Sequence, residues 1–430
     1  MATLPFHERL KPIGRQGNGL KILLLNQVFY PDVVAVAQYL ADLAADLGDA
    51  GHEVTVVCSE RGYDKPAERF PRKEVWHGIH IRRIFVVGQG KKSKLRRILS
   101  SLSFFLSSFF ALIAIRRQDV VVVTPPPPLL SFLAALVVHV RGGRLIYWNM
   151  DLNPDEAIAA GWLRADSLAA HILAWALRYS LRVSSSIIVL DRFMRDRIVA
   201  KGIPAEKAHV IPVWSLNETA NFDLAGRELF RDANGLKNKF VVMYSGNHSP
   251  LHPLTTLLEA ASRLKDNADV AFLFVGGGGE FERVKHFARD CGLTNISCLP
   301  YQPLDQLGAS LSAADLQVVL LGDPFVGIVH PCKIYNIMAV GAPFLYIGPP
   351  ESHIVDLQND TDVARMGNFV RHGDVDRVVA LIEKLSAQAD SGEPRPGRPS
   401  ILDGFARSML MPRMIDVIES AATPKRDVAQ

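Results

Sequence analysis

Residues 21–59 read KILLLNQVFYPDVVAVAQYLADLAADLGDAGHEVTVVCS, and this stretch decides the fold class. The apolar run at 21–29 predicts a buried strand, and residues 52–59 predict another. Residues 31–51 have the apolar spacing of a long helix that ends at Gly51. A strand, a helix and a strand in this order predict two parallel strands, because a parallel pair needs a crossover connection of about this length.

The same alternation continues along the chain and stops only once. Apolar runs at 80–87, 120–124, 144–151 and 185–191 predict further strands of one sheet. The pattern weakens at 214–239 and restarts with FVVMYSG at 240–246, so we predict a second doubly wound α/β domain. The predicted divisions are a flexible leader at 1–19, a first domain at 20–215, a second at 216–404, and a C-terminal helix at 405–430 that can cross back to the first domain.

Composition excludes several classes of protein. An apolar content of 48% and a charged content of 21% describe a globular chain of 430 residues. The net charge of +4 is small, and no nucleic-acid motif is present, so we predict no nucleic-acid partner. The four cysteines form no CxxC pair, which favours reduced thiols in a cytosolic protein. The first nineteen residues lack the apolar core of a signal peptide.

Glycine turns follow two predicted strands of the second domain. Gly246 and Asn247 end one strand, and Gly276 and Gly277 begin a run of four glycines after the next. Glycine lets a ligand approach the main chain and leaves N–H groups free for phosphate oxygens. An ordinary strand–helix turn is the alternative, but a four-glycine run favours ligand contact.

The segment GIVHPCKIYNIMAVGAP, residues 327–343, predicts a helix over 331–340 behind the glycine turn at Gly327. Lys333 then lies in the first turn, where a cation opposes the helix dipole. A bound anion would remove that conflict, whereas a solvated surface lysine is the alternative. We therefore predict an anion site at this helix start.

Three acidic residues follow the strand predicted at 144–151. The loop WNMDLNPDEA carries Asp151, Asp155 and Glu156 at a strand end, where ligand-facing loops lie. One carboxylate there could act as a general base for a substrate hydroxyl, and we favour Asp151. Capping of the following helix is the alternative for Asp155 and Glu156. The two D-x-D patterns, at 360–362 and 374–376, lie away from this loop, and we assign no metal to them.

Residues 91–117 join a basic cluster to an uncharged run. Five basic residues precede the run at 98–115, and Arg116 and Arg117 close it. A buried core helix, a membrane span and a helix in the membrane interface are the possible structures. A span would split the first domain. Four phenylalanines beside basic residues favour the interfacial helix, which would place the protein on a membrane surface.

The chain resembles GT-B glycosyltransferases of family 4 over most of residues 20–420. The segments that carry the resemblance in the second domain are YSGNHSPLHPLTTLLEAA at 244–261, FLFVGGGGEFERVK at 272–285 and HPCKIYNIMAVGAPFLYIG at 330–348. NQVFYPD at 26–32 and LADLAADLGDAGHEVTVVCS at 40–59 resemble the family's opening. WNMDLNPDEA resembles the loop typical of the colanic-acid and O-antigen branch.

The resemblance implies transfer of a sugar from a nucleotide-sugar donor, held by the second domain, to an acceptor held by the first. In this branch the acceptor is often a polyprenyl-diphosphate sugar. The family usually retains anomeric configuration and typically needs neither metal nor cofactor. The implied location is cytoplasmic, on the inner face of the cell membrane. Implied donor-binding residues are Gly246, Asn247, His252, Gly276, Gly277, Gly327, His330, Lys333 and Asn336; implied catalytic residues are Asp151 and Lys333; and Asp155 and Glu156 lie on the acceptor side.

The chain departs from the family pattern at two pairs of positions. Ile328 and Asn336 stand where the family commonly has glutamates, and Asn247 and His252 stand where it commonly has an arginine and a lysine. Lys333 is then the main cation. A catalytically silent GT-B partner subunit therefore stays open as an alternative. So does a GT-B sugar-nucleotide epimerase, although an epimerase has no need of a basic amphipathic segment.

Overall fold

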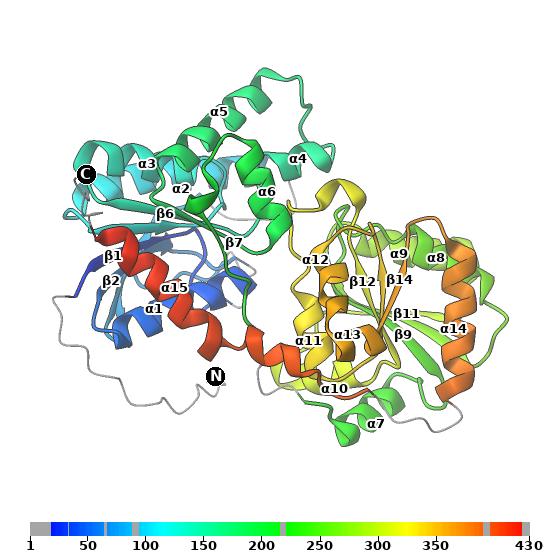
Figure 1. Ribbon diagram of the computed structural model, residues 1–430. Coiled ribbons are helices and arrows are strands. Elements are labelled where there is room, and N and C mark those ends of the chain that lie inside the picture. The colour runs from blue at the N-terminus through cyan, green and yellow to red at the C-terminus, as the bar shows by residue number, and fades with distance from the viewer. Residues whose placement is uncertain are drawn as a thin grey trace.

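Two α/β domains lie side by side in the computed structural model, each built on a mainly parallel sheet (Figure 1). The structure describes residues 19–32, 34–63, 67–87, 94–215, 221–389 and 396–423, with the backbone alone at 94–97 and 304. The predicted leader at 1–19 falls outside these ranges except for Gly19. The predicted fold class, two Rossmann-like domains, is confirmed.

The first sheet has the strand order β3-β4-β2-β1-β5-β6-β7-β8. Every neighbouring pair is parallel except β3 and β4. That edge hairpin was not predicted; its turn is His77-Gly78, where both residues have positive φ, as two-residue hairpin turns require. The strands are β1 (Lys21–Leu25), β2 (Glu53–Ser59), β3 (Lys73–Trp76), β4 (Ile79–Ile84), β5 (Val120–Val123), β6 (Arg144–Asn149), β7 (Ser186–Val189) and β8 (Ala208–Val210).

Helices cover both faces of this sheet. On one face α1 (Ala35–Asp49) packs beside α15 (Arg407–Ala422), which contacts β5, β6 and β7. On the other face α2 (Lys94–Ala114), α3 (Leu130–Arg141) and α5 (Leu168–Val183) lie in a row, with α3 against β5 and β6. Two shorter helices, α4 (Asp155–Ala159) and α6 (Arg192–Ala200), lie at the end of the domain that faces the second domain (Figure 1).

The second sheet is wholly parallel, in the order β11-β10-β9-β12-β13-β14. The strand order reverses between β9 and β12, and in such sheets ligands bind beyond the carboxyl ends of the strands at this reversal. The strands are β9 (Phe240–Asn247), β10 (Val270–Gly277), β11 (Ile296–Leu299), β12 (Leu316–Leu320), β13 (Phe344–Ile347) and β14 (Gly367–Val370).

The helix that carries Lys333 is shorter than the sequence predicts. The helix predicted over 331–340 is α11 (Lys333–Ala339), so Lys333 is its first residue and 330–332 form a turn before it. A 3₁₀ turn (Leu304–Gln306) precedes α10 (Leu307–Ser312). The other helices are α7 (Leu224–Ala233), α8 (Thr255–Arg263), α9 (Phe281–Asp290), α12 (His353–Asp356), α13 (Thr361–Met366) and α14 (Val375–Ala389); further 3₁₀ turns lie at Ala205–Lys207, Asp323–Phe325, Leu357–Asn359 and Ser400–Phe405.

The chain passes between the domains twice, and the two passages touch. The Ser215 N–H donates to the carbonyl of Phe405 at 3.3 Å. Beyond this contact α15 packs on the first domain through Met414 and Ile418, which are fully buried. Arg407 anchors the start of α15 by ion pairs with Asp42 at 2.8 Å and Asp46 at 2.9 Å. The last helix therefore belongs structurally to the first domain.

Candidate active site

The glycine turns after β9 and β10 pack against each other. Gly246 lies opposite Gly276 in the strand register, and both have positive φ. A Cβ atom on Gly276 would lie 2.0 Å from the Gly246 carbonyl oxygen, and one on Gly278 would lie 2.3 Å from the His248 oxygen. The close approach of the two turns therefore already requires two of the four glycines. The predicted ligand contact is not needed to explain them.

Lys333 lies under the first of these turns. Its Nζ is 3.6 Å from the centre of the Tyr244 ring on β9, and a Cβ on Gly246 would lie 3.1 Å from that nitrogen. The nitrogen is buried and has no hydrogen-bond partner among the described residues. Burial lowers the pKa of Lys333 to about 7. An amine in this setting is suited to bind an anion that arrives at the turn.

Two histidines near Lys333 are neutral at pH 7. Burial first, and the Lys333 charge second, lower the pKa of His252 to about 3 and that of His248 to about 4. The His252 Nδ1 donates to the carbonyl of Leu320 at 2.8 Å, because a carbonyl can only accept. The remaining ring nitrogen of neutral His252 is then an acceptor. His252 therefore adds no positive charge beside Lys333.

Asp151 lies at the end of the first domain that meets α11. The loop is fixed across the domains because the Leu152 N–H donates to the Ile328 carbonyl at 2.9 Å. Burial raises the pKa of the Cys332 thiol, and the charge of Lys333 lowers it. The charge of Asp151 raises the same pKa, so the Asp151 carboxylate lies near Cys332, at the start of α11. Burial and then the neighbouring Glu156 raise the pKa of Asp151 itself. A carboxyl group with a raised pKa at a domain boundary is suited to proton transfer.

The other two acids of this loop have different surroundings. Glu156 accepts a hydrogen bond from the Asn153 amide at 3.0 Å, and burial raises its pKa. Asp155 forms an ion pair with Lys201 at 2.7 Å, at the end of α6. Of the three acids, Asp151 and Glu156 interact with each other. Asp155, predicted on the acceptor side, holds α4 to α6 instead.

Three predicted donor-side residues lie against other parts of the protein. Gly327 has a φ of 69°, and a Cβ there would lie 2.6 Å from the Phe193 main chain of the first domain. Asn336 accepts a hydrogen bond from the Ser215 hydroxyl at 3.4 Å, beside the passages between the domains. His330 has both ring nitrogens engaged, as described next. Gly327 and His330 therefore contact the first domain, whereas Asn336 lies one helical turn from Lys333 on α11.

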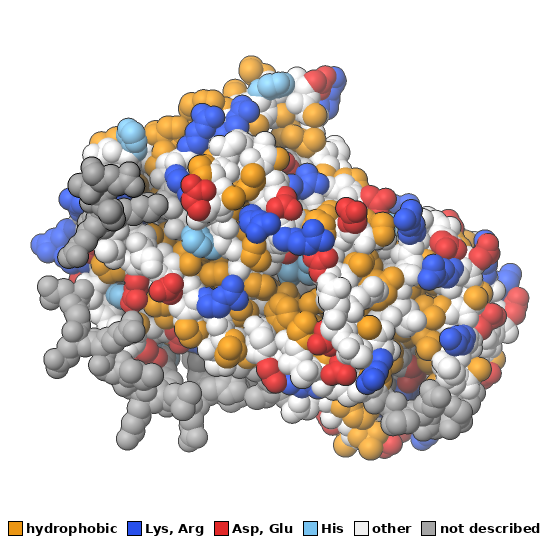
Figure 2. All heavy atoms as spheres, viewed as in Figure 1, with side chains coloured by type: hydrophobic (Ala, Val, Ile, Leu, Met, Phe, Trp, Pro, Cys, Tyr) orange, Lys and Arg blue, Asp and Glu red, His pale blue; other side chains and the backbone are white. Residues whose placement is uncertain are grey.

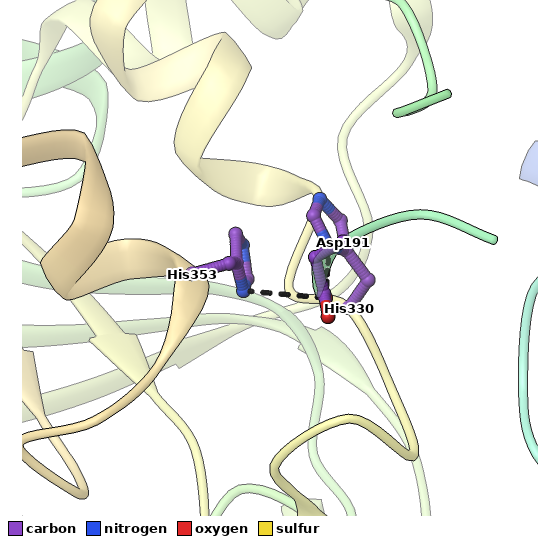
Figure 3. A group of neighbouring side chains, drawn as sticks. All are labelled: Asp191, His330 and His353. Carbon is purple, nitrogen blue, oxygen red and sulfur yellow. Dashed lines mark hydrogen bonds and ion pairs between the residues drawn. The ribbon is translucent and has the colours of Figure 1, made fainter. Parts of the chain in front are cut away.

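His330 belongs to a buried group that joins the domains (Figure 3). Its Nδ1 donates to Asp191 at 2.9 Å, and its Nε2 lies 2.8 Å from the Tyr335 hydroxyl. His353 stacks on His330 with the ring centres 3.7 Å apart. Burial opposes ionisation of Asp191, but the hydrogen bond and charge of His330 outweigh it and hold the pKa of Asp191 at about 2. Sequence reasoning missed Asp191, although it follows a strand just as Asp151 does.

The ligand atoms of Asp191, His330 and His353 lie within 4.8 Å of one another, a spacing that a metal ion could bridge. The orientation of the rings does not fit one. The two imidazoles are stacked 3.7 Å apart with only 23° between their planes, so their in-plane lone pairs lie in two nearly parallel planes and do not meet at one ion beside the rings. The group fits a hydrogen-bonded contact between domains.

Room for a ligand lies next to the histidines of the second domain. A cavity of about 450 Å³ opens at the ends of β12 and β14, and its walls include Pro253, Thr256, Gly322, Phe325 and His372. Pro253 follows His252 directly, and Gly322 follows Leu321 after β12. Lys333 does not line this cavity. At the glycine turn after β10, the side chain of Tyr301 lies against Gly276 and Gly277 and is 59% exposed.

Two family models match the chain, one for each domain. Residues 35–214 match the glycosyl transferase 4-like domain, and residues 226–391 match glycosyl transferases group 1. A putative colanic acid biosynthesis glycosyl transferase, WcaI of Escherichia coli strain K12, is 29% identical over 75% of this chain and 82% of its own length. A probable glycosyltransferase, WbjE of Pseudomonas aeruginosa, is 26% identical over 53% of this chain and 58% of its own length.

Solved structures share the fold at lower identity. Anabaena Alr3699/HepE, in complex with UDP and glucose, superimposes with a TM-score of 0.67 at 16% identity, over 93% of this chain and 100% of that one. Sucrose-phosphate synthase from Thermosynechococcus elongatus gives a TM-score of 0.68 at 16% identity, over 93% and 98%. Both domains and their order along the chain thus agree with one enzyme family. The chain belongs to the GT-B glycosyltransferases of family 4.

Proposed function

We propose that this glycosyltransferase moves a sugar from a nucleotide-sugar donor to a polyprenyl-diphosphate-linked saccharide during synthesis of a surface polysaccharide. The observation that carries the proposal is the buried Nζ of Lys333 beneath the Gly246 turn, which no described residue pairs, with Asp151 across the domain boundary. The name of WcaI, a putative colanic acid biosynthesis glycosyl transferase, supports polysaccharide synthesis, and that of WbjE supports glycosyl transfer. The complex of Alr3699/HepE with UDP supports a nucleotide-sugar donor.

Lys333 would neutralise the charge that grows on the leaving nucleoside diphosphate as the bond to the anomeric carbon breaks. A preorganised cation in a buried site stabilises such charge strongly. Main-chain N–H groups of the turns at Gly246 and Gly276 would add hydrogen bonds to the diphosphate. With a lysine in this role, the proposed reaction needs neither metal nor cofactor. The family resemblance supports retention of anomeric configuration.

Asp151 would take the proton of the acceptor hydroxyl while that oxygen forms its bond to the anomeric carbon. The nucleoside diphosphate leaves with the electron pair of the broken bond. The raised pKa of Asp151 brings its basicity closer to that useful at neutral pH. Glu156 supports this role by adding negative charge nearby.

We propose a cytoplasmic position on the inner face of the cell membrane, held through residues 91–117. Lys91 and Lys92 lie outside the described residues, while α2 exposes Leu102, Leu106 and Phe110. Among the residues that the structure describes, no helix is both long and apolar enough to cross a bilayer. Replacing Lys91, Lys92, Lys94, Arg96 and Arg97 by glutamine should release the protein from membranes in moderate salt, since each basic residue contributes about 1 kcal/mol at an anionic surface. A wild-type protein already free of membranes in low salt would contradict this position.

Incubation of the protein with labelled nucleotide sugars and a bacterial lipid extract tests the function. Label in an extractable lipid is the expected result. An altered nucleotide sugar without lipid product would indicate the epimerase instead. No product at all, with nucleotide binding retained, would indicate a silent partner subunit and overturn the proposal.

A further inference from the structure

Asp191 stands beside Asp151 at the edge of the first sheet. The neighbouring strands β6 and β7 are parallel, and Asn149 lies opposite Val189 in the register. The two aspartates each follow this pair by two residues. The position of Asp191 is fixed further because one of its oxygens accepts from the Met194 N–H at 2.8 Å and caps α6. A group bound to the other oxygen of Asp191 is therefore held at a set place relative to the acceptor-side loop.

The group bound to that oxygen is His330, and its ring is fixed to α11. Its Nδ1 donates to Asp191 at 2.9 Å, while its Nε2 forms a hydrogen bond with the Tyr335 hydroxyl of α11 at 2.8 Å. A tight turn, closed by the Cys332 N–H and the His330 carbonyl at 2.7 Å, separates His330 from Lys333. The ring is thus tied to α11 both through the main chain and through a side chain. A shift of the ring therefore shifts the first turn of that helix.

The surroundings of His330 restrict the orientation of its ring. His353 of α12 stacks on it with the ring centres 3.7 Å apart, and the Tyr335 ring stacks at 5.8 Å (Figure 3). The side chains of His330 and Asp191 are only 2% and 7% exposed. Hydrogen bonds in such water-excluded surroundings are strong, and loss of one partner leaves a buried polar group unpaired. The hydrogen bond between Asp191 and His330 is therefore a stiff link between the two domains.

Two further contacts flank this link. The Leu152 N–H donates to the Ile328 carbonyl at 2.9 Å; the donor follows Asp151 directly, and the acceptor lies two residues before His330. Nearer the surface, an ion pair joins α6 and α12, and Figure 2 shows basic and acidic side chains side by side where the two domains meet. The link therefore lies inside a closed contact between the domains, beside the loop that carries the proposed base.

We propose that Asp191 and His330 are positioning residues. Their hydrogen bond sets where the start of α11, and with it Lys333, stands relative to Asp151. Lys333 belongs to the second domain and Asp151 to the first, so the fold of neither domain alone sets their separation. A misplacement of about 1 Å between reacting groups costs a factor of about 10² in rate. The reacting roles of Lys333 and Asp151 rest on the proposed function, whereas the position of the helix does not.

Hydrogen exchange at the Leu152 amide tests the position of the helix without any substrate. His330→Ala removes the link, so the Leu152 hydrogen bond to the second domain should open more often and its exchange should quicken about tenfold or more. His330→Asn retains an N–H donor close to the place of Nδ1 and should exchange nearly as slowly as the wild type. His286→Ala, at an exposed position of α9, is the matched control and should change nothing. Unchanged exchange in His330→Ala, or protection lost throughout β9 and β10 as well, overturns the proposal.

Steady-state kinetics of the transfer reaction test the consequence for catalysis. With labelled nucleotide sugar and lipid extract, His330→Ala should lower kcat by a factor of about ten or more and change KM for the donor little, because the donor-binding turns lie within the second domain. His330→Asn should recover most of kcat because the bond to Asp191 is retained, and thermal unfolding shows that each variant folds. Full kcat in His330→Ala, or equal losses in both variants, overturns the proposal. A wild-type protein without transfer, whose Leu152 exchange still responds to His330→Ala, would count against the proposed function and leave the positioning intact.

Discussion

At the scale of single residues, Lys333 shows how surroundings set chemistry. Its amine has no acceptor within the described part of the chain, lies on an aromatic ring and has a pKa that burial lowers to about 7. A donor diphosphate stays fully ionised across this range and would raise the pKa of the amine, since opposite charges favour each other. Binding of the donor is therefore linked to uptake of a proton.

We expect the affinity for a nucleotide sugar to rise as the pH falls from about 8.5 toward 7, because more of Lys333 is then charged. Lys333→Ala should flatten this dependence and lower kcat by a factor of about 10² to 10³. Titration calorimetry at several pH values and steady-state kinetics measure the two effects. Lys285→Ala, on the surface of α9, is the matched control. An unchanged kcat and pH dependence in Lys333→Ala would remove the lysine from the site.

The same burial predicts a change in stability. The pKa of Lys333 is lowered in the folded state, so between about pH 7 and its ordinary value the unfolded chain binds more protons and stability rises with pH. Lys333→Met should raise the free energy of unfolding near pH 7 by roughly 1 to 4 kcal/mol, because it removes a buried unpaired amine. Urea unfolding at pH 7 and pH 9 measures this. The gain should shrink at the higher pH; a gain that grows would contradict the assignment.

Asp151 and Glu156 allow a paired test of the base. Asp151→Asn should abolish transfer and leave nucleotide-sugar affinity nearly intact, since it removes only a proton acceptor of the first domain. Glu156→Gln removes a charge that raises the pKa of Asp151. Because the base works when it is deprotonated, the transfer rate falls as the pH drops through the pKa of Asp151. In Glu156→Gln this pKa is lower, so the fall in rate on the acidic side of the pH–rate profile should move to lower pH. If the acidic side of the pH–rate profile does not move, a group other than Asp151 takes the proton.

How far the site could be predicted from the sequence differs from residue to residue. Asp151 and Lys333 could be proposed from the sequence because each stands at the end or start of a regular element. Asp191 and His353 were missed because their role comes only from contact between segments far apart in the chain. His330 was assigned to the donor by resemblance, yet its ring nitrogens contact Asp191 and Tyr335. Local patterns reveal strand ends, whereas contacts between domains leave no local pattern.

At the scale of elements, the side chain of Asp191 both caps the start of α6 and contacts the second domain. One oxygen of Asp191 accepts from the Met194 N–H at 2.8 Å and caps the helix, while the other accepts from His330. Nearby, Arg192 forms two hydrogen bonds with Asp356 of α12, at 2.5 and 2.8 Å. The start of α6 therefore holds the second domain in place.

Asp191→Asn and Asp191→Ala separate these two roles. Asparagine caps a helix as well as aspartate, so only the alanine variant should lose the cap, at a further cost of about 1 kcal/mol. The pKa of Asp191 is lowered in the folded state, so its charge stabilises the fold above the ordinary carboxyl range, and this is lost as the pH falls toward about 2. Urea unfolding at pH 7 and in acid measures both effects. Equal stability of the two variants would mean that the cap contributes nothing.

Element type was predictable where one periodicity dominates. The strands at 21–25 and 240–247 follow from their apolar runs, because a parallel sheet is buried on both faces. The edge strand β3 was missed because only Trp76 of its four residues is buried, so no apolar run marks it, and its signal lies in the two-residue turn His77-Gly78. The start of α11 was placed two residues early, because 330–332 make a tight turn in which His330 contacts the first domain.

At the scale of the whole molecule, the last helix completes the first domain. Ile418 and Met414 of α15 are buried on the sheet, whereas Met409 of the same helix is 58% exposed. Ile418→Asp should destabilise the first domain by several kcal/mol, because it buries a charge without a partner. Met409→Asp is the matched control and should change stability little. Hydrogen exchange should show protection lost in β5 to β7 and kept in β9 to β13; equal loss in both sheets would mean that the domains unfold as one unit.

The return of α15 to the first domain also sets an order of events on the ribosome. The residues that build the second sheet emerge before residues 407–422. The part of the first sheet beside α1, over β5 to β7, stays uncovered until those residues leave the exit tunnel. The domain made first is thus the domain finished last. Until α15 docks, we expect the uncovered strands β5 to β7 to be open to chaperones, and a chain cut before residue 407 to keep that surface open to aggregation.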